Sequence, residues 1–321
     1  EGFMPHINRR NALLGAAGAA ALGLSGHVYF AAPARASSGA GHFAYKIGDV
    51  DVIGLHDGYF ELPLNDSFIG NAELQDVEDA LEAGGHPRDV VPINFTQTLL
   101  KIGDEIILVD AGTGAQLAPT AGNMMDHLNA AGVDPASVTK VLVSHFHPDH
   151  IFGLMTKEEN AQVFPNAQIM VPEAEIAFWT DPATMSALPE NRKGLANRIV
   201  ATLGAWDNVE RYQDGATLAP GVTAKATHGH TPGHTAFVVS SGSDELVIAG
   251  DIANIPALFV ANPGWHARFD MDKAKAEAAR RSLFDQVIAD KATIAGYHFG
   301  FPNAGTIEKD GSGYAFIPMS I

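Results

Sequence analysis

Residues 144–154 read SHFHPDHIFGL, in which three histidines and an aspartate fall within six positions. In an extended segment, residues i and i+2 point the same way, so His145 and His147 can converge on one cation. Asp149 and His150 then face a second position, after a proline that ends the extended stretch. A chance match to this spacing is expected in roughly one such chain in a thousand. The stretch therefore predicts a metal site.

Later segments supply further ligand types, each next to an apolar stretch. They are His228, His230 and His234 in THGHTPGHT (227–235), Asp251 at the end of VIAGD, and His298 in AGYHFGFP. A carboxylate such as Asp251 can bridge two cations held close together. Oxygen and imidazole ligands without sulfur suit zinc, manganese, cobalt or iron, so ligand chemistry alone leaves the metal open.

Composition limits the class of protein. The chain has 321 residues, of which 46% are hydrophobic and 18% charged, with a formal net charge of −17 and no cysteine. Disulfides, thiolate nucleophiles and cysteine-ligated metals are excluded. Without clustered lysine and arginine, a nucleic-acid partner is not expected. Small neutral or cationic substrates fit this charge.

The N-terminus predicts export. Arg9 and Arg10 precede a weakly apolar Ala/Gly/Leu run, and Ala34-Arg35-Ala36 offers a small-x-small cleavage site. We interpret residues 1–36 as a twin-arginine-like signal to the periplasm or exterior, with residues 1–3 preceding Met4. The run is too short and too rich in Gly and Ala for a good membrane span, so no stable span is expected after its removal.

The remaining chain, 37–321, predicts one α/β domain, because strand-like and helix-like segments interleave without an internal linker. Expected strands cover 45–58, 105–112, 140–147 and 217–227, followed by a hairpin over 235–251, and expected helices cover about 189–204 and 270–291. Several expected strands end at the chemically interesting residues.

H-x-H-x-D-H, G-H-T-P-G-H-T, a strand-terminal G-D and a late histidine together resemble the metallo-β-lactamase superfamily. The resemblance implies an αββα four-layer sandwich, with two mixed sheets face to face and helices outside. It also implies two divalent metal ions, zinc being expected, ligated by His145, His147, His234, Asp149, His150 and His298, with Asp251 bridging. Asp110 in LVDAG would support a ligand from behind, and His228 and His230 would steady the turn before His234.

Further phrases, several of which lie outside the metal site, sharpen the likeness. LPLN, VFPNA, HGHTPGHT and EKDGSGYAFIPM resemble methyl parathion hydrolase and its lactonase relatives. This implies hydrolysis by a metal-bridging hydroxide, with Asp149 and Asp251 as catalytic residues that orient the nucleophile and move its proton. A homodimer is a further implication.

The substrate is less defined, because a metal-held hydroxide attacks either a lactone carbonyl or a phosphotriester. Trp179 is expected to line the pocket, Phe68 and Ile69 to form a lid, and Leu117 and Leu195 to stand where organophosphate-degrading relatives place aromatics. Fewer aromatics favour a lactonase acting on aryl, alkyl or acyl-homoserine lactones, with promiscuous phosphotriesterase activity. The alternatives are a methyl parathion type hydrolase, a glyoxalase-II-like thioesterase and a non-catalytic periplasmic metal carrier.

Overall fold

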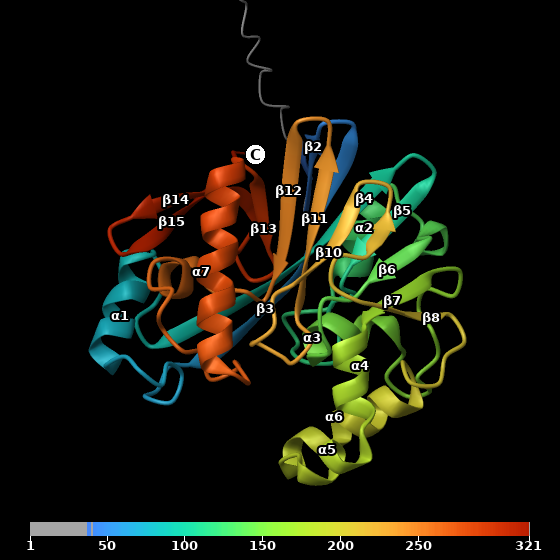
Figure 1. Ribbon diagram of the computed structural model, residues 1–321, viewed down its shortest axis with the longest axis horizontal. Coiled ribbons are helices and arrows are strands. Elements are labelled where there is room, and N and C mark those ends of the chain that lie inside the picture. Colours follow the sequence, from blue (N-terminus) through green and yellow to red (C-terminus); the bar gives the residue numbers. More distant parts are fainter. Residues whose placement is uncertain (1–36, 40, 321) are drawn as a thin grey trace, which may run out of the picture. The chain divides into compact units, whose positions relative to one another are not determined.

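Two mixed β-sheets form the centre of the structure, a computed structural model that describes residues 37–39 and 41–320 (Figure 1). The predicted export signal, residues 1–36, lies outside these described residues. The first sheet pairs its strands in sequence order: β1 (Ser37–Gly39), β2 (His42–Ile47), β3 (Val50–Pro63), β4 (Val90–Ile102), β5 (Glu105–Val109), β6 (Lys140–Leu142), β7 (Gln168–Pro172) and β8 (Val209–Tyr212). Its β1–β5 part is antiparallel, and β5 to β8 run parallel.

The second sheet is mostly antiparallel, with one parallel pair, β12 and β13. Its strands lie in the order β15 (Gly313–Pro318), β14 (Ala304–Asp310), β13 (Thr293–Gly296), β12 (Asp244–Gly250), β11 (Thr235–Ser241), β10 (Val222–Ala226) and β9 (Thr217–Ala219). The expected hairpin over 235–251 is the β11–β12 pair.

Helices pack on the outer face of each sheet. They are α1 (Leu74–Ala83), α2 (Met124–Ala130), α3 (Pro148–Ile151), α4 (Glu173–Thr180), α5 (Pro182–Ala187), α6 (Glu190–Ala201) and α7 (Lys273–Asp290), with short turns η1 (Pro135–Ser137), η2 (Phe152–Leu154) and η3 (Pro256–Val260). The expected helix over 270–291 is α7, whose Asp272 side chain accepts a hydrogen bond from the N–H of Lys275 at 3.1 Å and caps the start. The expected helix over 189–204 is α6.

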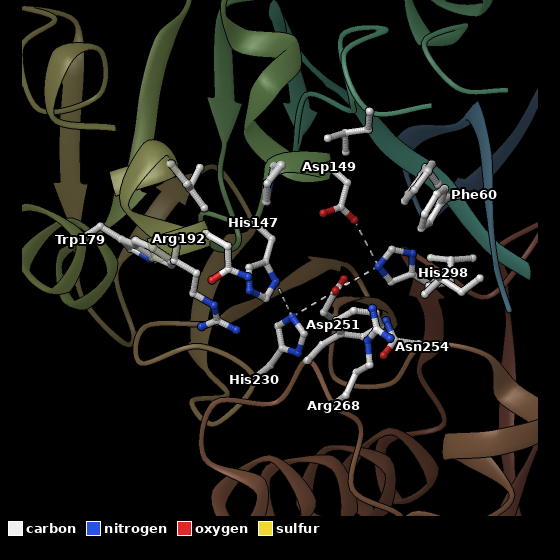
Figure 2. A pocket seen from close by; sticks show the side chains of 18 residues that line it. Phe60, His147, Asp149, Trp179, Arg192, His230, Asp251, Asn254, Arg268 and His298 are labelled. Carbon is white, nitrogen blue, oxygen red and sulfur yellow. Dashed lines mark hydrogen bonds and ion pairs between the residues drawn. The ribbon is translucent and has the colours of Figure 1, made fainter. Parts of the chain in front are cut away.

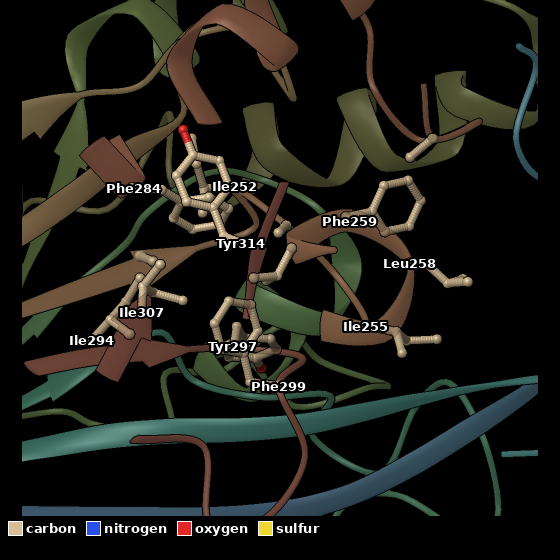
Figure 3. Close-up of a cluster of buried hydrophobic side chains, with 14 of the residues drawn as sticks. Ile252, Ile255, Leu258, Phe259, Phe284, Ile294, Tyr297, Phe299, Ile307 and Tyr314 are labelled. Atoms are coloured by element: carbon tan, nitrogen blue, oxygen red, sulfur yellow. The ribbon is translucent and has the colours of Figure 1, made fainter. Parts of the chain in front are cut away.

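Continuous apolar runs form strands here because both faces of each sheet are covered. In β5, Ile107 and Val109 point into the core between the sheets, whereas Leu108 points into the outer core beneath α2, α4 and α6. In β12, Ile248 faces the other sheet and Val247 faces the core that contains α7. Figure 3 shows that last core, in which Phe284 of α7 lies among Ile294, Ile307 and Tyr314. The predicted αββα sandwich is confirmed.

Candidate functional site

Most of the predicted metal residues come together because their strands end at one edge. β5 and β6 are parallel, as are β12 and β13, so the carboxyl end of each pair opens on one edge of its sheet. Asp110 follows β5, residues 144–150 follow β6, Asp251 follows β12 and His298 follows β13. The GHTPGHT turn precedes β11, which is antiparallel to β12, and so reaches the same edge.

One cluster contains three histidines and an aspartate (Figure 2). His147 Nδ1 lies 3.0 Å from His145 Nε2 and 2.9 Å from His230 Nε2. His230 Nε2 in turn lies 3.2 Å from Asp251 Oδ2. The ligand atoms of these four residues all lie within 4.8 Å of one another, close enough to hold one metal ion.

A second cluster, Asp149, His150, Asp251 and His298, shares its Asp251 with the first. His298 Nε2 lies 3.0 Å from Asp251 Oδ2, and His150 Nε2 lies 3.1 Å from Asp251 Oδ1. Asp149 Oδ2 lies 3.4 Å from His150 Nε2. The two oxygens of Asp251 therefore face both clusters, as a bridging carboxylate requires.

Hydrogen bonds to groups outside the clusters determine which ring nitrogen of each histidine faces the cluster. Metal-binding histidines commonly donate their other ring N–H to a carboxylate or carbonyl. The structure contains three such pairs: His150 Nδ1 with Asp110 Oδ2 at 2.8 Å, His230 Nδ1 with Asp270 Oδ1 at 2.9 Å, and His298 Nδ1 with the Asn94 carbonyl at 2.6 Å. In each ring the Nε2 atom is left for the cluster.

Asp110, predicted to support a ligand, lies 2.8 Å from His150 Nδ1 through its Oδ2. It is buried, accepts hydrogen bonds from the Ser144 N–H and hydroxyl at 2.7 Å each, and has a φ of 58°. A left-handed aspartate is uncommon and concentrates at functional sites. The turn after β5 thus directs this carboxylate at the loop after β6.

His234 requires a correction, because the structure places His230 in the cluster instead. His234 Nε2 accepts a hydrogen bond from the Asp251 N–H at 2.9 Å, and its Nδ1 lies 2.8 Å from the Thr227 hydroxyl. Both ring nitrogens are therefore engaged outside the clusters. His228 is exposed and joins neither cluster. We accordingly replace His234 by His230 as the candidate ligand.

Burial and neighbouring charges set the protonation of the donors. Burial, reinforced by neighbouring histidines, lowers the pKa of His145 and His147 well below its usual value. Burial also lowers the pKa of His234, to about 3. For His230, burial is outweighed by hydrogen bonds to Asp251 and Asp270, which raise the pKa to about 9. Binding a cation there displaces this proton.

The donor set fits divalent cations. Burial raises the pKa of Asp251, but His298 and His150 outweigh it and bring the pKa well below its usual range, so this carboxylate is ionised. His150 Nε2 and Asp251 Oδ1 are both buried and face each other at 3.1 Å, but neither has a partner in good hydrogen-bond geometry. Buried polar atoms are normally satisfied, and a cation would satisfy both. Neutral imidazoles and carboxylates are the ligands that zinc accepts.

Glu175 at the start of α4 joins the two histidine segments, and the sequence reasoning missed it. This fully buried carboxylate accepts hydrogen bonds from the Phe146 N–H at 3.2 Å and from the Gly233 N–H at 2.7 Å. The indole N–H of Trp179 donates to it at 2.9 Å. Glu175 thus holds both loops and one wall of the neighbouring pocket.

Arg280 of α7 anchors the residue behind His230. Its guanidinium lies 3.2 Å from Asp270 Oδ2, and its Nε donates to the Ile252 carbonyl at 2.7 Å. A buried arginine therefore fixes both the carboxylate that orients His230 and the backbone that follows Asp251. No local motif marks Asp270 or Arg280, because only α7's packing brings them to the site.

A pocket of about 380 Å³ opens over the two clusters (Figure 2). His147, Asp149, His230, Asp251 and His298 form part of its lining. Its apolar wall comes from β3, β4, α4, α6 and loops: Phe60, Leu62, Ile93, Phe95, Leu117, Trp179, Leu195 and Phe269. Concave, largely apolar pockets with a few convergent polar groups are typical of small-molecule sites.

The predicted pocket residues fall into two groups. Trp179, Leu117 and Leu195 line the pocket. Phe68 and Ile69 do not form a lid: they are 1% and 2% exposed and belong to the core around α7. Phe68 packs against Phe259 and Phe269, with ring centroids 6.3 and 5.9 Å apart. It supports the pocket from behind, through Phe269.

The pocket is also more aromatic than predicted. Phe60 and Phe95 come from the long β3–β4 ribbon, where Phe60 pairs with Ile93 in register. The alternation of apolar and other residues in YFELPL and PINF could have indicated a shared apolar face. It could not have indicated that this face reaches the metal residues.

Comparison with known proteins places the chain in a family. The model for the metallo-beta-lactamase superfamily matches residues 96–298. The chain therefore belongs to the metallo-β-lactamase superfamily.

Individual relatives are more distant. N-acyl homoserine lactonase AttM of Agrobacterium fabrum is 32% identical over 136 residues, 40% of this chain and 46% of AttM. The chain spans less than half the length of the curated relatives it matches. The solved structure of AidC, a dizinc quorum-quenching lactonase in complex with a product, N-hexanoyl-L-homoserine, has a TM-score of 0.79 at 26% identity, covering 88% of this chain and 98% of AidC. The hydrolase AbOPH has a TM-score of 0.80 at 28% identity, covering 89% and 99%.

Proposed function

We propose that this protein is a binuclear metal-dependent hydrolase that opens lactones. The observation that carries the proposal is the pair of ligand clusters that share Asp251 at the floor of a largely apolar pocket. The likeness to AidC and AttM supports a lactone as the substrate class. Aryl, alkyl and acyl-homoserine lactones all fit an apolar wall of this kind.

The candidate ligands are His145, His147 and His230 for one cation, and Asp149, His150 and His298 for the other, with Asp251 between them. Two divalent cations, when bound, would lower the pKa of a water molecule and polarise the scissile carbonyl. Zinc is the metal we propose, because the structurally similar AidC is a dizinc lactonase and zinc accepts imidazoles and carboxylates as ligands.

The protein's own groups position the substrate and move the proton. Lactone opening joins the oxygen of water to the acyl carbon and breaks the ring C–O bond, and the ring oxygen takes up a proton. The Asp149 side chain, 17% exposed and lining the pocket, can carry that proton from the water to the leaving oxygen. Trp179, Leu117 and Leu195 would hold the acyl portion and exclude water.

A phosphotriesterase of the methyl parathion hydrolase type is the second candidate. Phe60, Phe95, Trp179 and Phe269 give the pocket more aromatic surface than its sequence suggested, which suits an aryl leaving group. Around Trp179, however, Leu117 and Leu195 make the wall mixed, and this favours a lactone.

The test compares kcat/KM for an aryl lactone and a methyl phosphotriester on zinc-reconstituted protein. We expect the lactone to be preferred by about a hundredfold, or ~2.7 kcal/mol in barrier. The His150→Ala variant should abolish both activities. A phosphotriester preference of the same size would reverse the assignment. Stoichiometric zinc binding without turnover of either substrate would instead indicate a carrier.

We also propose that residues 1–36 direct export to the periplasm or exterior. Fractionation of cells that express the full chain, followed by N-terminal sequencing of the exported form, would test this. A cytoplasmic, uncleaved product would contradict it. Separately, no helix among the described residues is long and apolar enough to cross a membrane.

A further inference from the structure

Asn254 is a buried polar side chain on the pocket wall that the proposed mechanism does not use. Four polar residues outside the clusters line the pocket: Asn191, Arg192, Asn254 and Arg268. Of these four, only Asn254 is buried, with 4% of its surface exposed. Its carboxamide makes no hydrogen bond within residues 37–39 and 41–320, and Figure 2 shows it on the His298 side of the site, opposite Trp179. An unpaired amide therefore lies at the candidate substrate site.

The backbone holds Asn254 in a fixed place near the clusters. It follows the shared aspartate, Asp251, by three residues, so their Cα atoms are at most roughly 11 Å apart. Ile252 and Ile255 on either side are each 2% exposed and pack in the core around α7. The Nε atom of Arg280 donates to the Ile252 carbonyl at 2.7 Å. The fold itself, rather than a bound substrate, thus positions this amide.

A buried amide without a partner makes a pocket selective. Buried polar groups nearly always have a hydrogen-bond partner, and in the free protein water in the pocket can supply it. A substrate that displaces this water must replace its hydrogen bonds, because otherwise the amide is left unpaired. Sites built around such a group reject ligands that lack the matching group.

The chemistry of the carboxamide limits what can match it. Asn254 is uncharged and offers one acceptor oxygen and two N–H donors, so its counterpart is an uncharged group such as an amide or a hydroxyl. The short chain distance from Asp251 places that counterpart close to the scissile carbonyl. The apolar wall around Phe60, Phe95 and Trp179 provides no equivalent partner.

We propose that Asn254 is a specificity-determining residue whose carboxamide hydrogen-bonds an uncharged polar group next to the scissile ester of the preferred substrate. The inference rests on the proposed lactonase function and narrows the substrate class within it. The clusters receive the ring carbonyl, Asn254 receives the polar substituent, and the apolar wall receives the rest of the molecule. Lactones with only alkyl or aryl substituents fit the same wall but leave Asn254 unpaired.

The test uses three lactones of one ring size that differ only in the substituent next to the ring carbonyl: a secondary amide, a hydroxyl or an alkyl group. The measured quantity is kcat/KM for each polar lactone divided by that for the alkyl lactone, on zinc-reconstituted full-length protein. In the wild type we expect at least one ratio of about ten or more, mainly through KM. Asn254→Leu has nearly the same shape without hydrogen-bonding atoms and should lower that ratio about tenfold.

The variants also separate specificity from structural damage. In Asn254→Leu, kcat/KM for the alkyl lactone should stay at the wild-type level or rise, whereas loss of fold or metal would lower it for all three lactones. Asn254→Ala has a smaller side chain, should lose the same ratio, and replaces the leucine variant if that variant does not fold. Asn129→Leu makes the same change at an exposed asparagine of α2 outside the pocket lining and should leave the ratio unchanged.

The outcomes distinguish this inference from the proposed function. Wild-type ratios of one or below for both polar lactones, or a variant that keeps the wild-type ratio, overturn the role of Asn254. An equal fall in kcat for all three lactones would mean that Asn254 acts on the reacting carbonyl, and would overturn it too. If no lactone is hydrolysed, the proposed function fails, and calorimetric binding of the same molecules decides. Tighter binding of a polar lactone, lost in Asn254→Leu, would then support the inference, and equal binding would contradict it.

Discussion

His230 and His234 show how much depends on single residues, because both belong to one turn and only His230 joins the ligand cluster. Asp270 Oδ1 accepts a hydrogen bond from His230 Nδ1, so His230 Nε2 faces His147. His234 Nε2 accepts a hydrogen bond from the Asp251 N–H. A Cβ atom at Gly250 would lie 2.7 Å from the same ring nitrogen. Gly250, with a φ of 53°, keeps that space open.

The first prediction separates the two histidines. His230→Ala should reduce zinc affinity at one site by more than about a hundredfold, beyond the 10–100-fold that an outer-shell change costs. His234→Ala should retain two zinc ions per chain with roughly tenfold weaker binding. Calorimetric zinc titration of both variants measures this. Loss of one zinc in His234→Ala, with none lost in His230→Ala, would mean that His234 and not His230 is the metal ligand.

Glu175 is the second residue whose role depends on contacts. Its two oxygens accept three N–H donors, and glutamine would supply only one acceptor oxygen together with a competing donor. We therefore expect Glu175→Gln to lower the free energy of unfolding by about 1–3 kcal/mol and zinc affinity by roughly tenfold or more. Urea unfolding and zinc titration test both effects.

Glu173→Gln is the matched control, because Glu173 lies on the same helix in an exposed pair with Arg211 at 3.3 Å. Its free energy of unfolding should stay within about 0.5 kcal/mol of wild type. Unchanged zinc affinity in Glu175→Gln would show that the histidine loops do not depend on this carboxylate.

At the scale of secondary structure, α3 and η2 pack on the turn after β5. This packing positions two of the four residues of the second ligand cluster. A Cβ atom at Gly153 would lie 1.8 Å from the Ala111 carbonyl oxygen, so the backbones at Gly153 and Ala111 are in direct contact. The Ala111 N–H also donates to the His150 carbonyl at 2.8 Å. This close approach sets the distance from Asp110 to His150.

The third prediction follows from that contact. Gly153→Ala should destabilise the fold by about 1–3 kcal/mol through overpacking and weaken zinc binding as Asp110 and His150 separate. Gly194→Ala in α6 has open space around its Cβ and should instead stabilise by roughly 0.5–1 kcal/mol. Urea denaturation of the two variants compares them directly. Equal stability of both variants would show that the α3 contact relaxes without cost.

Across the described molecule, the clusters draw on both sheets. His145, His147, Asp149 and His150 follow the first sheet, whereas His230, Asp251 and His298 belong to the second. Three separate hydrophobic cores hold the sandwich together without these residues. Cations should therefore act as cross-links that add stability to a fold that forms without them.

The fourth prediction concerns thermal stability. Zinc at a hundred times the Kd of each site should add about 2.7 kcal/mol per site, which for a domain of this size raises Tm by roughly 4–5 °C per site. Chelation should reverse the shift and leave a cooperative transition. His150→Ala should show a clearly smaller shift. A metal-free protein without a cooperative transition would mean that the fold itself requires metal.

The sequence by itself determined the ligand types, because H-x-H-x-D-H, the strand-terminal Asp251 and His298 are local patterns attached to apolar strands. The family and the sandwich followed from the resemblance that these motifs carry. It also indicated Asp110 and Trp179. Only the tertiary structure decided between His230 and His234, since Asp270 arrives from the loop before α7, forty residues away. Likewise, only the tertiary structure shows that Phe68 and Ile69 are buried and that Glu175, Arg192 and Arg268 lie at the site. The reason is physical: local patterns report the chemistry and periodicity of a segment, whereas hydrogen-bond partners and pocket walls depend on which distant elements pack together.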